Sequence, residues 1–142
     1  MLTDKNKIVV NLLRIGAYLL REGNRIAEKY GINQQQFVVL NFISENELVS
    51  QKEICSSLLY EKSNVSKIIK RLEKIGLVDK KSSSGDLRYS HINITPKGQK
   101  VINEGIVEFN LFNDNLLQQL PINEIDKILE ASQMLNKIIK GE

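Results

Sequence analysis

Apolar residues recur every three or four positions through most of this chain, and only residues 80–98 depart from that spacing. A spacing of three and four places apolar side chains on one face of an α-helix. Within the exception, Ile92 and Ile94 alternate with His91 and Asn93, which is the two-residue period of a β-strand. The chain is therefore expected to fold as amphipathic helices around one small hairpin.

Capping signals divide the helical pattern into segments. Gly31 is a natural C-cap for the first helix. Asn33 with Gln36, and Ser50 with Glu53, have the spacing of capping boxes that open the second and third helices. Later starts are signalled by Ser63, Thr95-Pro96 and Asn123. These signals predict helices at about 8–30, 33–43, 50–58, 63–75, 96–120 and 123–139, with strands at 77–81 and 89–94.

The order of these elements predicts the fold class. A short helix, a turn, a second helix and a hairpin form the pattern of a winged helix-turn-helix, so the fold is expected to be mainly α (α+β) with a two-stranded β-wing. We expect one domain over 1–142, in which 33–95 form the winged lobe and 1–31 and 96–142 form a helical dimerisation region. The helix at 96–120 would be about 36 Å long, which is more than a small core needs.

Composition argues against several classes of protein. No apolar run is long enough to cross a membrane, and the N-terminus lacks the features of a signal peptide, so a cytoplasmic protein is expected. One histidine and one cysteine, His91 and Cys55, do not make a metal site or a disulfide. No nucleophile motif or phosphate-binding loop is present, so we expect neither an enzyme nor a cofactor.

Charge is distributed unevenly along the chain. Residues 46–100 carry 11 Lys and Arg against 6 Asp and Glu, a net charge of +5, whereas residues 101–142 carry 3 against 7, a net charge of −4. A basic middle segment is suited to phosphates, and the acidic tail is not.

The predicted helix at 63–75 has two faces. Its apolar face is Val65, Ile68, Ile69 and Leu72, and its other face has Glu73 as its one acidic residue. Short polar side chains can reach base edges in the major groove, and longer cationic ones can reach phosphates. A solvated helix face with no partner is the alternative interpretation. The candidate DNA contacts on this face are Ser63, Asn64, Ser66, Lys67, Lys70 and Arg71, and Ser50 and Gln51 of the preceding helix are added to them.

The predicted hairpin carries a second group of candidates. An arginine at the tip of a β-ribbon, Arg88, can enter the minor groove, and the carboxylate of Asp86 can hold its guanidinium in place. Lys80 and Lys81 can meet flanking phosphates. The alternative is an ordinary Asp–Arg turn pair without a function.

Taken in order, three motifs make the chain resemble the MarR family of transcription regulators. They are "RLEKIGLV" at 71–78, the Asp-x-Arg pair at 86 and 88, and "IT-x-x-G" at 94–98. The resemblance covers about residues 33–100. It implies a homodimer whose first and last two helices interleave, and which binds a pseudo-palindromic operator in double-stranded DNA. It also implies that Ser63, Asn64, Ser66, Lys67 and Arg71 lie at or near the major groove and that Asp86 supports Arg88. Leu87 departs from the family, which often has a basic residue there.

The same resemblance suggests an effector. Many members bind a small, often aromatic, anionic molecule between the dimer helices and the winged lobe. The residues here that would line such a site are Arg14, Tyr18, Phe37, Leu40 and Phe109. An apolar stripe at this spacing also suits an ordinary core.

The sequence therefore favours a homodimeric DNA-binding regulator that acts as a repressor. A dimeric winged-helix protein-interaction module without DNA recognition is one alternative, and a cysteine-based redox-responsive regulator is another. Cys55 bears on the second, but it is expected to face inward as a small hydrophobic residue.

Overall fold

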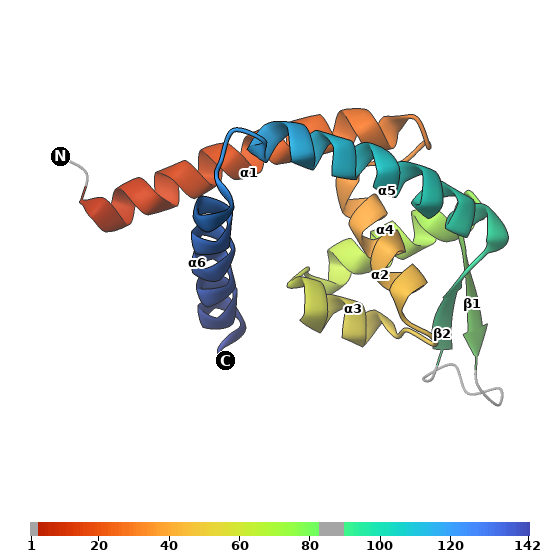
Figure 1. Ribbon diagram of the computed structural model, residues 1–142. Coiled ribbons are helices and arrows are strands. Elements are labelled where there is room, and N and C mark those ends of the chain that lie inside the picture. Colours follow the sequence, from red (N-terminus) through yellow and green to blue (C-terminus); the bar gives the residue numbers. More distant parts are fainter. Residues whose placement is uncertain (1–2, 83–89) are drawn as a thin grey trace. The chain divides into compact units, whose positions relative to one another are not determined.

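The computed structural model describes residues 3–82 and 90–142 (Figure 1). Its elements confirm the predicted class, mainly helical with one two-stranded sheet. The chain divides into two compact units, 1–105 and 106–142, at a point within the fifth helix. In chain order the elements are α1 (Asp4–Glu28), α2 (Gln34–Glu45), α3 (Gln51–Leu58), α4 (Lys62–Lys74), β1 (Val78–Ser82), β2 (Ser90–Ile94), α5 (Pro96–Leu117) and α6 (Ile122–Lys140).

The core of the first unit lies among α2, α3, α4 and the hairpin, which pack against one another (Figure 1). Each helix contributes the apolar stripe that its spacing predicted. Fully burying one such aliphatic side chain contributes about 1.5–3 kcal/mol, so this cluster accounts for much of the stability of the lobe. Its fully buried side chains include Leu40, Ile43, Ile54, Ile69, Leu72, Val78 and Ile92.

The hairpin is attached to the lobe through β2. Strands β1 and β2 are antiparallel, with Val78 opposite Ile94 and Lys80 opposite Ile92. Val49, just before α3, forms a bridge to Ile92 in which each residue's N–H donates to the other's carbonyl, at N–O distances of 3.3 and 2.7 Å. Val49 and Ile92 are both buried. The base of the wing is thus fixed to the lobe by backbone bonds and by apolar packing.

The junction between α4, the hairpin and α5 depends on Thr95. Its hydroxyl Oγ1 accepts a hydrogen bond from Gly98 N (3.0 Å) and donates one to Gly76 O (2.7 Å). Its own N–H donates to Leu77 O. The predicted role of Thr95 as the cap of α5 is confirmed, and these bonds give the physical reason for the "IT-x-x-G" motif.

Two predicted helix caps were wrong. Helix α4 begins at Lys62, one residue before Ser63, and follows Glu61, whose side chain makes no capping bond. Helix α6 begins at Ile122 after Pro121, so Asn123 lies inside the helix. In both places an extended residue with φ near −65° already precedes the first helical turn, and proline fixes that angle at Pro121.

Some other boundaries also differ from the prediction, whereas two further caps agree with it. The capping interactions of Asn33 and Ser50 are present, with Gln36 N donating to Asn33 Oδ1 and Glu53 N donating to Ser50 Oγ. The first strand begins at Val78 rather than at 77, and α5 ends at Leu117 rather than at 120. The predicted start of the second strand, at 89, lies outside the described residues.

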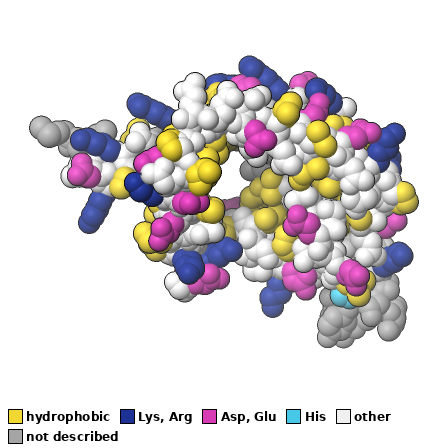
Figure 2. Space-filling model, viewed as in Figure 1, with side chains coloured by type: hydrophobic (Ala, Val, Ile, Leu, Met, Phe, Trp, Pro, Cys, Tyr) yellow, Lys and Arg dark blue, Asp and Glu magenta, His cyan; other side chains and the backbone are white. Residues whose placement is uncertain are grey.

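Each unit leaves apolar side chains uncovered. On α1 of the first unit, Ile8, Leu12 and Ile15 are about half exposed. In the second unit, α6 has no buried residue, and Ile138 is 73% exposed. Hydrophobic side chains are accordingly visible at the surface (Figure 2). Within residues 3–82 and 90–142, no helix is long and apolar enough to cross a membrane.

Candidate DNA-binding surface

Helix α4 has the two faces that its sequence predicted. Val65, Ile68, Ile69 and Leu72 are buried in the core of the lobe. On the opposite face, Asn64 and Ser66 are half-buried and the remaining polar residues are exposed. Since the apolar face fixes the helix, its polar face is held toward solvent as one unit. The exposed residues are Ser63, Lys67, Lys70, Arg71 and Lys74.

Two polar side chains of α4 lie beside glutamines of neighbouring helices. The Asn64 amide donates to Gln35 Oε1 of α2 at 3.5 Å, and the Ser66 hydroxyl donates to Gln51 Oε1 of α3 at 3.3 Å. Both are long and therefore weak hydrogen bonds, which DNA can replace. Gln35 was not among the predicted site residues, because only the packing of α2 against α4 brings it near Asn64.

The start of α3 supplies Ser50 and Gln51. The Ser50 hydroxyl oxygen caps the helix by accepting from Glu53 N at 3.1 Å, which leaves its O–H available as a donor. Beside Gln51, a surface depression is lined by Lys52, Cys55 and Lys62. Cys55 was predicted to face inward, but it is only half-buried, and Ile54 is the buried residue of α3.

The turn between α3 and α4 has an unusual backbone. Leu59 takes the left-handed conformation, with φ 59° and ψ 35°, and its side chain is 45% exposed. Most residues pay a steric cost in this conformation because of their β-carbon. Glycine has no β-carbon and avoids the cost, and asparagine tolerates the conformation better than leucine does. Tyr60, which follows it, is half-buried, and this burial raises the pKa of its phenol.

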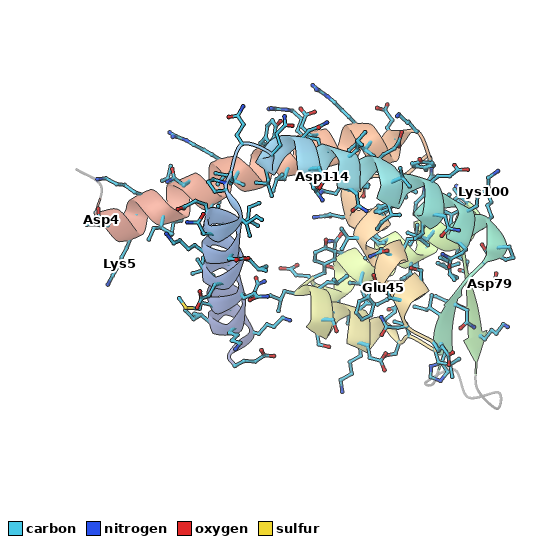
Figure 3. All side chains as sticks on the ribbon, viewed as in Figure 1. Asp4, Lys5, Glu45, Asp79, Lys100 and Asp114 are labelled. Carbon is cyan, nitrogen blue, oxygen red and sulfur yellow. The ribbon has the colours of Figure 1, made fainter. Side chains whose placement is uncertain are left out.

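The described part of the wing presents two lysines. Lys80 and Lys81 are exposed on β1, and Asp79 beside them is the only carboxylate in the described strands (Figure 3). His91 is half-buried opposite Lys81, and its Nδ1 is a buried atom for which the described structure gives no hydrogen-bond partner. The predicted tip residues Asp86, Leu87 and Arg88 lie outside the described residues.

Arg71 does not simply extend into solvent with the lysines of α4. Its Nη2 donates to the backbone carbonyl of Gly31 at 3.2 Å. Gly31 belongs to the turn that joins α1 to α2. The sequence predicted a DNA contact for this arginine, whereas the structure gives it a partner within the protein.

The predicted effector residues are distributed over different parts of the chain. Phe37 and Leu40 are core residues, and a β-carbon on Gly105 would overlap the Phe37 ring. Arg14 and Tyr18 are exposed on α1, where the Arg21 guanidinium lies 5.5 Å from the centre of the Tyr18 ring. Phe109 belongs to the second unit. Among the residues with described positions, no three His, Cys, Asp or Glu are grouped so that they could hold a metal ion.

Known proteins resemble this chain in sequence and in fold. The model of the MarR family matches residues 30–88, from the end of α1 to the wing. The HTH-type transcriptional regulator MgrA of Staphylococcus aureus is 25% identical over 116 residues, which are 82% of this chain and 76% of that protein. The transcriptional repressor MprA of Escherichia coli is 26% identical over 119 residues, 82% of this chain and 68% of that protein.

A solved structure agrees with these relatives. The crystal structure of a putative MarR family transcriptional regulator from Listeria monocytogenes complexed with 26mer DNA has a TM-score of 0.85 and 26% identity, over 99% of this chain and 91% of that one. The helix order, the wing and the two-faced α4 agree with these similarities. Over residues 30–88, and in its fold, this chain is similar to the MarR family of transcription regulators.

Proposed function

We propose that this protein, a DNA-binding transcription regulator, acts in the cytoplasm as a homodimeric repressor that occupies pseudo-palindromic operator DNA. The observation that carries the proposal is the polar face of α4. It combines three exposed lysines with Asn64 and Ser66, while the opposite face of the same helix is buried in the core. A helix held in this way presents its polar side chains in one fixed direction.

The size and chemistry of α4 suit the major groove. Its 13 residues span about 20 Å, and a groove about 12 Å wide admits one helix. In this proposal Ser63, Asn64 and Ser66 meet base edges, since they lie in the first half of the helix. Lys67 and Lys70 reach phosphates further along, joined by Lys80 and Lys81 of the wing. Arg88, supported by Asp86, is proposed to enter the minor groove, on the strength of the Asp-x-Arg motif.

The uncovered apolar residues support a dimer. Ile8, Leu12 and Ile15 of α1, and Ile128 and Ile138 of α6, are each about half exposed or more. Apolar surfaces of this kind are ordinarily covered by a partner, and most soluble oligomers are symmetric dimers. We therefore propose that 1–31 and 96–142 dimerise and that 33–95 bind DNA. Sedimentation equilibrium tests this directly, because a stable monomer at micromolar concentration would refute the dimer.

Repression follows from occupancy, since a dimer on operator DNA competes with the transcription machinery for the same site. The similarity to a relative named as a transcriptional repressor supports this direction of regulation. Release by a small aromatic or anionic effector is proposed from the family resemblance alone. A thermal-shift screen with aromatic carboxylates would test it, with stabilisation of the protein as the expected result.

The DNA-binding proposal is tested by fluorescence anisotropy against the protein's own promoter DNA at several salt concentrations. Each phosphate contact contributes about 0.9 to the slope of log K against log salt. Lys67→Ala is expected to weaken binding and reduce the slope. The matched control is Lys100→Ala, which removes the same charge from α5 (Figure 3) and is expected to change neither. Binding that is absent, or insensitive to salt and sequence, would instead support a protein-interaction module.

A further inference from the structure

We propose that Arg71 is a positioning residue, which ties the recognition helix α4 to the corner between α1 and α2, and is not a phosphate contact. The inference rests on the proposed role of α4 in reading DNA. Its basis is the hydrogen bond from Arg71 Nη2 to Gly31 O at 3.2 Å, which joins residues 40 positions apart in the chain.

The acceptor belongs to a corner that is fixed by other bonds. Gly31 turns the chain with φ +74°, a conformation that suits glycine. Asn24 of α1 accepts a hydrogen bond from Gln34 N at the start of α2, with an N–O distance of 2.9 Å. Asn33 and Gln36 close a reciprocal capping box at 2.8 and 2.9 Å. The Gly31 carbonyl is therefore a defined anchor point for a side chain on another helix.

The Arg71 bond adds to the packing that runs from α1 to α4 through α2. Helix α1 packs on α2, and α2 packs on α4. The bond adds a direct connection from the end of α1 to the last turn of α4. A guanidinium is suited to this role, because it donates in a fixed plane and keeps its charge at every physiological pH.

The consequence for DNA binding concerns the orientation of α4. Its buried side chains, such as Ile69 and Leu72, do not depend on Arg71, so the lobe should fold without the bond. Helix α1 carries part of the proposed dimer surface. A bond between its end and α4 therefore fixes the recognition helix relative to the dimer, and so fixes the spacing between the two helices that must meet successive half-sites.

The two possible roles of Arg71 give different salt dependences. If it only positions α4, Arg71→Met should weaken operator binding about fivefold, as for loss of one hydrogen bond, and leave the salt slope unchanged. If it contacts a phosphate, the slope should fall by about 0.9 per contact. Lys70→Met is the matched control. It removes an exposed charge from the adjacent position of α4 and is expected to reduce the slope.

A second measurement needs no DNA. Hydrogen exchange at the amides of Gly31 and Gln34 reports on the corner, since these amides donate to Glu28 O and Asn24 Oδ1. Exchange should accelerate several-fold in Arg71→Met, remain unchanged in Lys70→Met and return toward the wild-type rate in Arg71→Lys, which keeps a charged donor. Thermal unfolding of each variant checks that the protein is folded.

The results separate the two proposals. Faster exchange together with an unchanged slope supports the positioning role. Unchanged exchange or a reduced slope in Arg71→Met overturns it. Failure of the wild-type protein to bind promoter DNA would overturn the proposed function, while the exchange measurement would still decide whether Arg71 holds the corner.

Discussion

The backbone carbonyl of Leu77 lies against Gly98, so close that a β-carbon on Gly98 would overlap its oxygen. Leu77 is the residue between the turn after α4 and the start of β1, and Gly98 lies in the first turn of α5. The Thr95 hydroxyl donates to Gly76 O and the Thr95 N–H donates to Leu77 O, so these bonds and this contact join the end of α4, the wing and α5 in one junction.

Substitution of Gly98 by alanine is expected to destabilise the lobe. The obstructing atom is backbone and cannot rotate away, so the junction must move, which we expect to cost about 2–3 kcal/mol of unfolding free energy. Urea unfolding measures this. Glu104→Ala, at an exposed position of the same helix, is the control and should stay within about 0.5 kcal/mol of wild type. A Gly98→Ala protein as stable as wild type would show that the junction is loosely packed.

A substitution at Leu59, the left-handed residue between α3 and α4, is expected to raise stability rather than lower it. Leu59→Asn should stabilise the protein by up to about 1 kcal/mol, because asparagine tolerates φ near +59° and little buried apolar area is lost. The comparison is Leu58→Asn. Leu58 is the last residue of α3 and half-buried, so that variant should be less stable than wild type. Equal destabilisation in both variants would contradict the account of the turn.

The burial of Tyr60 is expected to make the free energy of unfolding decrease as pH rises above about 10. Burial raises the pKa of its phenol, so the folded protein retains a proton that the unfolded chain releases above about pH 10. Its contribution is fully present below that pH and declines as pH rises above it. Urea unfolding between pH 8 and 11 should show Tyr60→Phe losing less stability than wild type above pH 10. The control is Tyr18→Phe, which replaces an exposed tyrosine. If wild type and Tyr60→Phe lose stability in parallel as pH rises, the burial of Tyr60 has no such effect.

Helical periodicity predicted the core of the lobe because it is a local property. The spacing of Val65, Ile68 and Leu72 assigns them to one face of α4 whatever surrounds the helix, and all three are buried. The same is true of the Asn33 capping box, whose partners are three residues apart.

What the sequence did not reveal depends on distant packing. The partner of Arg71 is 40 residues away and becomes its neighbour only when the α1–α2 corner folds against α4. Cys55 follows Ile54 on a helix of eight residues, which is too short for its apolar spacing to decide which of the two lies inside. Ser63 has a capping side chain, but the left-handed Leu59 and the extended Glu61 place the helix start one residue earlier.

The central claim is that α4 reads bases, and Asn64→Ala tests it most directly. The DNA would be an operator recovered by sequencing the genomic fragments that the protein binds, compared with a scrambled duplex of the same length in anisotropy titrations. An amide that meets a base edge contributes about 1–3 kcal/mol of discrimination. Asn64→Ala should therefore lose about tenfold or more in operator affinity while binding the scrambled duplex as wild type does. Equal losses on both duplexes, or no loss on either, would contradict the claim.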